Sequence, residues 1–254
     1  MSNEERRGPR KLVSLILTTY NCKDMLVQTL QSIEQQTYPS IELIIVDGNS
    51  TDGTVEAIEE YSQRSPYPLQ WISEPDQGIY DAINKGIGLA KGDYIEVMND
   101  EYSVDDAIEQ LVQATESQEH YVGAHADLVY ADQGVVIRAW KMGEGRIGSG
   151  WMPGHPTLLL ESSVYNKYGL YDTTYTCSAD YEFMVRFLTA GEQLAYVPQN
   201  LVSMYYGGTS TATLSSYLVS FREAHRALRK NHVRFPLGIC LIRTVRVLWQ
   251  FVKK

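Results

Sequence analysis

Two short apolar runs in the first fifty residues each end in a cluster of polar residues, and this arrangement constrains the fold more than any other feature. Residues 13–17 (VSLIL) lead into residues 18–21 (TTYN), and residues 41–46 (IELIIV) lead into residues 47–54 (DGNSTDGT). Short apolar runs separated by an amphipathic helix predict a βαβ unit with parallel strands. The carboxyl ends of such strands form the ligand crevice of an open sheet. Hydroxyls, an aromatic ring and a carboxylate at those ends suit a nucleotide base and ribose, so we expect a nucleotide-binding protein.

Strands and helices continue to alternate up to about residue 100. Apolar residues recur at helical spacing between the strands, and Gly and polar residues separate the elements. This alternation predicts an open, mostly parallel sheet with helices on both faces. The expected helices are residues 23–36, 51–63 and 78–90, and the further expected strands are residues 69–73 and 94–98.

The second half of the chain has a mixed pattern. Residues 128–137 predict a β-hairpin around an Asp-Gln-Gly turn, and the Gly-rich residues 141–153 predict a mobile loop. A strand at 157–160, a helix at 180–189, a strand at 194–197 and two final helices are expected next. No linker separates the halves, and 254 residues suffice for a sizeable core, so we expect both halves to share one core.

The net charge of −9 conceals an uneven distribution. Residues 222–254 contain nine Lys and Arg against one acid, a charge of +8, so the remaining residues carry −17. An acidic body argues against nucleic acid as a partner, and the basic end favours a local partner of negative charge. Three widely spaced cysteines fit a reducing compartment and show no metal-site spacing. No apolar run follows the charged residues 1–11, so we expect no signal peptide and a cytoplasmic protein.

Several segments resemble, in the expected order, the landmarks of the inverting glycosyltransferase family 2, which has the GT-A fold. Residues 13–21 resemble the opening strand and base-binding turn of that family, and residues 44–54 (IIVDGNSTDGT) resemble its second strand and loop. Residues 74–86 (EPDQGIYDAINKG) resemble the segment that closes over ribose and phosphate, and residues 92–100 (GDYIEVMND) resemble the strand that leads to the metal motif. Residues 154–156 (GHP) resemble the acceptor-side segment, and residues 178–183 (SADYEF) resemble the segment with the catalytic base.

The resemblance implies a GT-A α/β domain at residues 12–210, built on a mixed, mostly parallel sheet. Its nucleotide-binding half would be residues 12–102 and its acceptor half residues 103–210, between a flexible tail at 1–11 and a helical extension at 211–254. The implied activity is transfer of a sugar from a nucleotide-diphosphate sugar to a hydroxyl of a glycan or polyprenyl-linked acceptor, with inversion. The implied role is bacterial exopolysaccharide, capsule or O-antigen assembly.

Thr18, Tyr20 and Asp47 are the candidate contacts to the base, and they mildly favour a uridine carrier. A carboxylate can accept the imide N–H of uracil, and a Tyr ring can stack on the base. Asp47 also suits a turn or N-cap carboxylate before a helix. Asp76 and Lys85 are candidates for ribose and phosphate contacts, beside a helix amino terminus that offers free N–H groups. A solvated helix charge is the alternative for Lys85.

The acidic motif is Asn99-Asp100-Glu101, whereas the family usually has adjacent or nearly adjacent aspartates after Asn. The resemblance implies that Asp100 and Glu101 hold Mg²⁺ or Mn²⁺ on the diphosphate, with Asp100 preferred as the direct ligand. Such hard cations favour carboxylate oxygens and keep positions open for substrate. A strand-end turn with surface acids is the alternative. Because the motif departs from the family pattern, a catalytically impaired regulatory or partner subunit that binds nucleotide sugars is the rival function.

Asp180 is the candidate general base. It begins a helix, and its side chain is expected on the same side as the apolar stripe of Phe183, Met184 and Phe187. A carboxylate beside apolar groups can act as a base toward an alcohol, and an Asp that serves the helix dipole is the alternative. Glu182 lies about 200° around the helix from Asp180 and is expected to face elsewhere.

Three further segments are candidates for positions near the substrates. His155, in a Gly-His-Pro turn, could meet the acceptor or the diphosphate, or it could make a structural hydrogen bond. Residues 207–210 (GGTS) resemble the end of the family core, where a loop can cover the donor, and residues 143–150 could form a lid.

The end of the chain, residues 236–254, predicts an amphipathic helix with Leu241 and Val245 on one face and Arg243 and Arg246 on the other. Its length and charges do not fit a membrane-spanning helix. Basic residues with a Trp suit the interface of an anionic leaflet, which predicts a peripheral protein on the inner face of the plasma membrane. A helix packed on the domain, or on a second subunit of a homo-oligomer, is the alternative.

Overall fold

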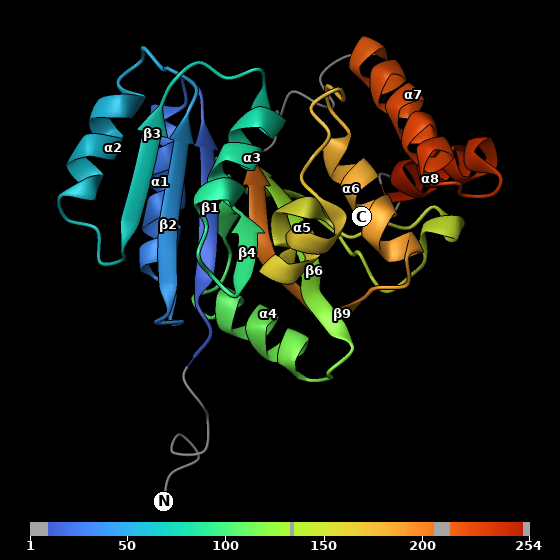
Figure 1. Ribbon diagram of the computed structural model, residues 1–254, viewed down its shortest axis with the longest axis horizontal. Coiled ribbons are helices and arrows are strands. Elements are labelled where there is room, and N and C mark those ends of the chain that lie inside the picture. The colour runs from blue at the N-terminus through green and yellow to red at the C-terminus, as the bar shows by residue number, and fades with distance from the viewer. Residues whose placement is uncertain (1–9, 133–134, 206–213, 251–254) are drawn as a thin grey trace, which may run out of the picture.

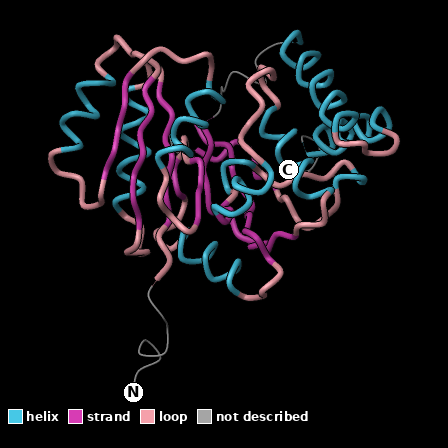
Figure 2. The backbone as a smooth tube through the Cα atoms, viewed as in Figure 1, coloured by secondary structure: helices cyan, strands magenta, loops and turns pink. Residues whose placement is uncertain are grey.

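The computed structural model describes residues 10–132, 135–205 and 214–250. Most of the predicted tail at 1–11 and the predicted donor-covering residues 207–210 lie outside the described residues. Figure 2 shows a central set of strands with helices on either side of it. The mixed α/β class expected from the sequence is confirmed.

The first half of the chain forms the parallel part of the sheet. Its strands are β1 (Val13–Thr19), β2 (Ile41–Asp47), β3 (Leu69–Ser73) and β4 (Tyr94–Val97), and its helices are α1 (Lys23–Glu34), α2 (Thr54–Ser62) and α3 (Ile79–Leu89). β1 pairs in parallel with β2 and with β4, and β2 pairs in parallel with β3. All seven residues of β2 are buried, because helices cover both faces of this part of the sheet.

The second half extends the same sheet with mixed pairing. Its strands are β5 (Glu101–Tyr102), β6 (Tyr121–Asp132), β7 (Val135–Trp140), β8 (Leu159–Glu161) and β9 (Gln193–Tyr205). Its helices are α4 (Ala107–Glu116), α5 (Ser162–Tyr168), α6 (Ala179–Thr189), α7 (Leu214–Lys230) and α8 (Pro236–Gln250). Within the described residues the strand order is β3-β2-β1-β4-β8-β6-β9-β5, with β7 paired to β6. Figure 1 shows α2 and β3 at one end of the molecule and α7 and α8 at the other.

Alternate side chains of the strands point to opposite faces of the sheet and pack into two separate hydrophobic cores. On one face Leu15 and Leu43 pack with α1, α2 and α4, and on the other face Ile16 and Ile44 pack with α3, α5 and α6. Helix α3 approaches β1 so closely that a Cβ on Gly86 would lie 2.5 Å from a methyl of Ile16. A larger residue at this position would therefore push α3 away from the sheet.

Several elements differ from the sequence-based expectation. Helices α4 and α5 and the short strand β5 were not expected, and β9 continues well beyond the predicted 194–197. The strand expected at 157–160 begins at Leu159, after a 3₁₀ turn at His155–Thr157. The loop expected to be mobile, residues 141–153, is instead packed, because Met142, Ile147 and Trp151 are buried.

The last two helices pack on the second half of the domain. Ala224, Ala227 and Leu228 of α7 and Ile239 and Cys240 of α8 are buried in the core that contains α6. Within the described part of the chain, no helix combines the length and the apolar composition needed to cross a bilayer.

Candidate active site

The carboxyl ends of β1 and β2 open into a cleft of about 860 Å³. Its walls are the turns after β1 and β2, the first turns of α1 and α3, and the residues at the ends of β4 and β9. Of the five residues predicted to contact a nucleotide, Thr18, Tyr20 and Asp76 line this cleft, whereas Asp47 and Lys85 do not. The Tyr20 side chain is 68% exposed, so its ring is accessible to a stacking base.

Asp47 lies behind the cleft wall. Its carboxylate is fully buried and accepts hydrogen bonds from the hydroxyls of Thr19 (2.9 Å) and Ser73 (2.7 Å) and from the amide (2.9 Å) and hydroxyl (2.5 Å) of Ser50. Burial alone would raise the pKa of Asp47, but the hydrogen bonds from Ser50, Ser73 and Thr19 outweigh it and hold the pKa below its usual value. Asp47 therefore joins the ends of β1, β2 and β3, which is the turn role that its sequence position also suits.

Side-chain hydrogen bonds connect the turn after β1 to the turn after β2. The Asn21 side-chain oxygen accepts a hydrogen bond from the Thr51 amide at 2.8 Å, which ties the turn after β1 to the turn after β2. The Asp52 carboxylate accepts hydrogen bonds from the amides of Lys23 (3.2 Å) and Thr54 (3.1 Å), the first residues of α1 and α2. One carboxylate thus satisfies the free amide groups of two helix starts, and both helices are anchored to the same turn.

Asn99 connects the end of β4 to the end of β1. Its side-chain oxygen accepts a hydrogen bond from the Thr18 amide, and its side-chain amide donates to the Thr18 hydroxyl, both at 2.8 Å. Because the Thr18 hydroxyl oxygen accepts from Asn99, its own hydrogen is free to be donated to a ligand in the cleft.

Lys85 holds Asp76 at the cleft rather than facing the cleft itself. Its Nζ lies 2.8 Å from an oxygen of Asp76, 2.9 Å from Glu74 and 3.4 Å from Asp81. Hydrogen bonds with Asp76 and Glu74 raise the pKa of Lys85 above its usual value. Since three carboxylates already surround this ammonium group, Lys85 positions Asp76, and a direct phosphate contact by Lys85 stays a prediction.

Asp100 and Glu101 come directly after Asn99, which lines the cleft, but neither is itself among the residues that line it. Glu101 is exposed and begins β5, where it pairs with Ser203 of β9, and Asp100 is partly exposed. Burial, with a smaller contribution from the Glu101 charge, raises the pKa of Asp100 to about 6 against the opposing hydrogen bond of the Tyr205 amide. Among the described residues, the charged neighbour that acts on Asp100 is therefore another carboxylate.

Two adjacent hard oxygen donors suit Mg²⁺ or Mn²⁺. Within the described part of the chain, no group of three or more His, Cys, Asp or Glu side chains converges on one point. The donors in the described part of the chain therefore fit a cation whose coordination substrate oxygens would complete.

Asp180 lies in the first turn of α6. Tyr80 contacts it from α3, the helix whose first turn forms part of the cleft wall. The Tyr80 hydroxyl donates a hydrogen bond to Asp180 Oδ1 at 3.0 Å, and Tyr80 follows Ile79, which lines the cleft. Burial, and next the charge of Asp180, raise the pKa of Tyr80, so its phenol stays a donor. Within the described residues, no side chain donates to Asp180 Oδ2, which leaves this oxygen open to a substrate hydroxyl.

Glu182 faces a different set of groups, as expected. It is fully buried, and its carboxylate contacts Arg186, Lys230 and Asn231. Two cations and an amide thus satisfy this carboxylate, so Glu182 holds α6 against α7 and is not available as a base.

His155 belongs to the same cluster as Asp180. Its Nε2 lies 2.9 Å from the Tyr171 hydroxyl, and the Tyr171 ring stacks on Tyr80 with ring centres 5.9 Å apart. Burial lowers the pKa of His155, so its ring is neutral at pH 7. The tertiary structure therefore brings His155 and Asp180 to the two ends of one aromatic pair.

Tyr80 and Asn99 are functional candidates to which the sequence-based reasoning gave no role. Both lie inside segments that had been recognised, residues 74–86 and 92–100. The sequence signal that could have identified them is their position: Tyr80 stands at the start of a helix and Asn99 at the end of a strand. Each is a polar residue in the same segment as an acid that had been given a role.

Known glycosyltransferases match this chain over most of its length. The chain is 28% identical over 242 residues to a "PGL/p-HBAD biosynthesis glycosyltransferase" of Mycobacterium tuberculosis, which covers 91% of this chain and 90% of the relative. It is 31% identical over 196 residues to an uncharacterized glycosyltransferase of the same species, with 68% of each chain covered.

Solved structures show the same fold at low identity. A mannosyltransferase from Pyrobaculum calidifontis in complex with GDP-Man and Mn²⁺ superposes with a TM-score of 0.68 at 18% identity, over 92% of this chain and 69% of that one. S. aureus TarS in complex with UDP-GlcNAc also has a TM-score of 0.68, at 16% identity, over 85% of this chain and 66% of that one. The predicted GT-A fold is confirmed. The model of glycosyl transferase family 2 matches residues 14–178, which is well over half of this chain. The chain therefore belongs to this family and is a glycosyltransferase.

Proposed function

We propose that this glycosyltransferase moves a sugar from a nucleotide-diphosphate sugar, with UDP favoured, to a hydroxyl of a glycan or lipid-linked acceptor, with inversion. The observation that carries the proposal is the Tyr80–Asp180 hydrogen bond, which ties a carboxylate to α3, the helix whose Ile79 and Ala82 line the cleft. The solved relatives with GDP-Man and UDP-GlcNAc support a nucleotide sugar as the donor. We propose exopolysaccharide, capsule or O-antigen assembly as the role.

In the proposed reaction, Asp180 acts on the acceptor. Its free oxygen takes the proton of the acceptor hydroxyl while that hydroxyl oxygen attacks the anomeric carbon of the donor. The bond from the anomeric carbon to the diphosphate breaks, and the nucleoside diphosphate departs with the electron pair on the face opposite the attack. A single displacement of this kind inverts the anomeric centre. Tyr80 keeps the carboxylate in one orientation throughout.

The donor nucleotide would occupy the cleft at the ends of β1 and β2. The exposed Tyr20 ring would stack on the base, and the free hydrogen of the Thr18 hydroxyl would be donated to it. Asp76, held by Lys85, would accept hydrogen bonds from the ribose hydroxyls. Asp47 would act from behind, by holding the turn at Ser50 in place.

A divalent cation, Mg²⁺ or Mn²⁺, is the cofactor that we propose for Asp100 and Glu101. When bound, it would supply positive charge to the diphosphate. Asp100 directly follows Asn99 of the cleft and is the preferred ligand, while Glu101 is exposed and pairs with Ser203 through its backbone. The Mn²⁺ complex of the solved relative supports this proposal.

The decisive experiment compares Asp180→Asn with the wild type in binding and in turnover. Isothermal titration with UDP and GDP, and with their sugars, is expected to give equal affinities for both proteins. Release of nucleoside diphosphate in the presence of simple glycan acceptors is expected to fall about 10²- to 10⁴-fold in the variant, since that is the usual contribution of a general base.

Asp105→Asn serves as the matched control, because Asp105 is also an aspartate but is exposed and does not line the cleft. If Asp180→Asn turns over as fast as the control variant does, the assignment of Asp180 as the general base is wrong. Nucleotide-sugar binding by the wild type without turnover would favour the impaired regulatory subunit.

The outer face of α8 supports a second part of the proposal, contact with an anionic membrane surface. Leu237, Leu241 and Val245 follow one another at helical spacing and are 55%, 54% and 61% exposed. Arg243 instead turns inward, with its guanidinium 4.4 Å from the centre of the Tyr181 ring. The apolar stripe of α8 therefore faces outward, on the part of the chain that carries a charge of +8. An exposed apolar stripe on a basic segment suits an anionic leaflet.

Liposome flotation tests this contact with the full chain. Wild-type protein is expected to float with vesicles that contain anionic lipid and not with neutral vesicles, and Leu241→Glu together with Val245→Glu is expected to abolish flotation. Val136→Glu is the matched control, because Val136 is equally exposed but lies on β7. Flotation unchanged by the α8 substitutions would refute the contact, and a concentration-dependent dimer that they dissociate would identify a second copy as the partner.

A further inference from the structure

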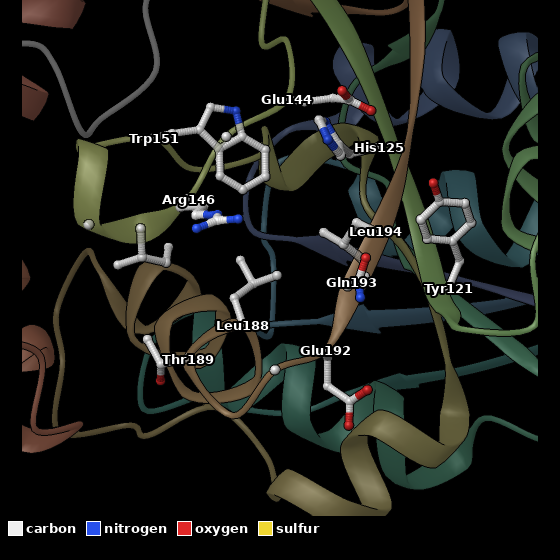
Figure 3. Close-up of a pocket in the computed structure, with 14 residues that line it drawn as sticks. Tyr121, His125, Glu144, Arg146, Trp151, Leu188, Thr189, Glu192, Gln193 and Leu194 are labelled. Atoms are coloured by element: carbon white, nitrogen blue, oxygen red, sulfur yellow. The ribbon is translucent and has the colours of Figure 1, made fainter.

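A second cavity, of about 720 Å³, lies away from the nucleotide cleft. It is bounded by the starts of β6 and β9, the end of α6 and residues 144–151 (Figure 3). β6 runs in the same direction as β1, because β6 is antiparallel to β8 and β8 is antiparallel to β4. The cavity is therefore at the amino-terminal edge of the sheet, whereas the nucleotide cleft is at the carboxyl edge. Along α6, Leu188 of the cavity lies about 12 Å from Asp180.

The wall formed by residues 144–151 is held in a defined position. The Trp151 indole N–H donates to the carbonyl groups of Met142 (3.1 Å) and Gly143 (2.9 Å). Asp127 accepts hydrogen bonds from the Met142 amide at 2.7 Å and from a tyrosine hydroxyl of β9 at 2.8 Å. Gly145 packs on the Trp151 ring so tightly that an added Cβ would lie 2.3 Å from it. The cavity wall is thus preorganised, which lowers the entropy cost of binding a ligand.

His125 supplies a buried polar group without a partner. Its side chain is 1% exposed and lines the cavity, and its Nδ1 has no hydrogen-bond partner among the described residues. The ring is packed between Tyr196, with ring centres 5.2 Å apart, and Trp151, at 5.4 Å. Burial lowers the pKa of His125 to about 4, so the ring is neutral at pH 7 and has one donor and one acceptor nitrogen. A buried polar atom without a partner is uncommon and indicates a missing ligand or water.

Positively charged, negatively charged and neutral polar side chains surround an apolar floor in this cavity. Leu188 and Leu194 lie at the centre of the cavity in Figure 3, and Arg146 points toward them. The side chains of Arg146, Glu144 and Gln193 are exposed, and none forms a hydrogen bond or ion pair with another described residue. The cavity therefore offers a cationic donor, an anionic acceptor, an amide and an imidazole around an apolar surface. An anion would meet the Glu144 carboxylate as well as the Arg146 guanidinium, so the set favours an uncharged ligand.

We propose that this cavity is a second carbohydrate site, which binds an uncharged sugar residue of a glycan at a distance from the transfer site. A pyranose ring has an apolar C–H face that fits the leucine floor, and hydroxyl groups that both donate and accept hydrogen bonds. Pockets of this size bind through an apolar lining with a few orienting polar groups. The inference goes beyond the proposed reaction and does not require sugar transfer.

Saturation-transfer NMR on the full chain tests the proposal, with maltotriose, cellotriose and triacetylchitotriose as probes. UDP is present in excess, so that the nucleotide cleft is filled. At least one probe is expected to receive saturation and to bind with a Kd of about a millimolar. Arg146→Ala and Gln193→Ala are expected to weaken this binding about fivefold or more, the value of one hydrogen bond. Arg64→Ala is the matched control, because Arg64 is an exposed arginine that pairs with Glu34 on the far side of the domain.

Two further variants separate this site from the nucleotide cleft and from a purely structural role. Tyr20→Ala is expected to reduce UDP affinity and to leave the oligosaccharide signal unchanged. His125→Phe is expected to keep or raise the melting temperature, since it removes a buried unpaired nitrogen, and to weaken oligosaccharide binding. Absence of signal from all three probes would overturn the proposal. So would binding that Arg146→Ala and Gln193→Ala leave unchanged, or displacement of the probe by inorganic phosphate.

Discussion

Glu96 gives this protein a pH dependence of stability that originates in one carboxyl group. The side chain lies on β4 and is fully buried; its Oε2 accepts a hydrogen bond from the Tyr102 hydroxyl at 2.9 Å, and its Oε1 has no partner among the described residues. Burial raises the pKa of Glu96 from the usual 4.5 to about 8, and the Tyr102 hydrogen bond opposes this only in part. At neutral pH Glu96 is therefore protonated in the folded protein and ionised in the unfolded chain.

The sign and size of the effect follow from proton linkage. Between pH 4.5 and about 8 the folded state binds one more proton at this position than the unfolded state does. The stability that Glu96 contributes is fully present below pH 4.5 and is lost as the pH rises toward 8, at about 1.4 kcal/mol per pH unit. From pH 6 to pH 8 the loss in the free energy of unfolding is about 2 to 3 kcal/mol.

Glu96→Gln removes this titration and keeps a similar shape. Urea unfolding, followed by circular dichroism at pH 6 and pH 8, is expected to show the variant gaining about 2 to 3 kcal/mol relative to the wild type at the higher pH. Glu119→Gln is the control, because Glu119 is exposed and is expected to change the pH dependence by less than about 0.5 kcal/mol. Equal pH dependence in Glu96→Gln and in the wild type would refute the reasoning.

Three further predictions address the active site. Tyr20→Ala is expected to weaken UDP binding by about 1–3 kcal/mol without changing the melting temperature, since its exposed ring offers only stacking; calorimetry that finds equal affinity would argue against base stacking there. Tyr80→Phe is expected to lower kcat about tenfold and to leave the KM for the donor unchanged, because the Asp180 carboxylate loses the hydrogen bond that fixes its orientation. An effect on KM alone would contradict this role. Asn99→Ala is expected to cost about 1–3 kcal/mol in urea unfolding because the Thr18 amide loses its partner, and a stability equal to that of the wild type would show that the bridge contributes nothing.

Local pattern was enough to predict the parallel half of the sheet. β3 begins and ends at the predicted residues 69 and 73, and α3 and α6 begin within one residue of the expected positions. These elements are specified by short-range signals: buried apolar runs, helical periodicity and the polar residues that end each strand. The short strand β5 and the continuation of β9 beyond 197 carry no such signal, because they are stabilised by pairing with each other across about a hundred residues of sequence.

The sequence alone determined the α/β class and the family resemblance, and it predicted a nucleotide cleft with Thr18, Tyr20, Asp76 and Asp180 as site residues, because each of these follows from a local motif. Only the tertiary structure decided which side chains meet. Asp47 proved to be buried behind the cleft, Tyr80 reached Asp180 from another helix, and His125 was left without a partner in a second cavity. Burial and hydrogen bonding depend on chain segments that pack together from distant positions, and no local pattern specifies those partners.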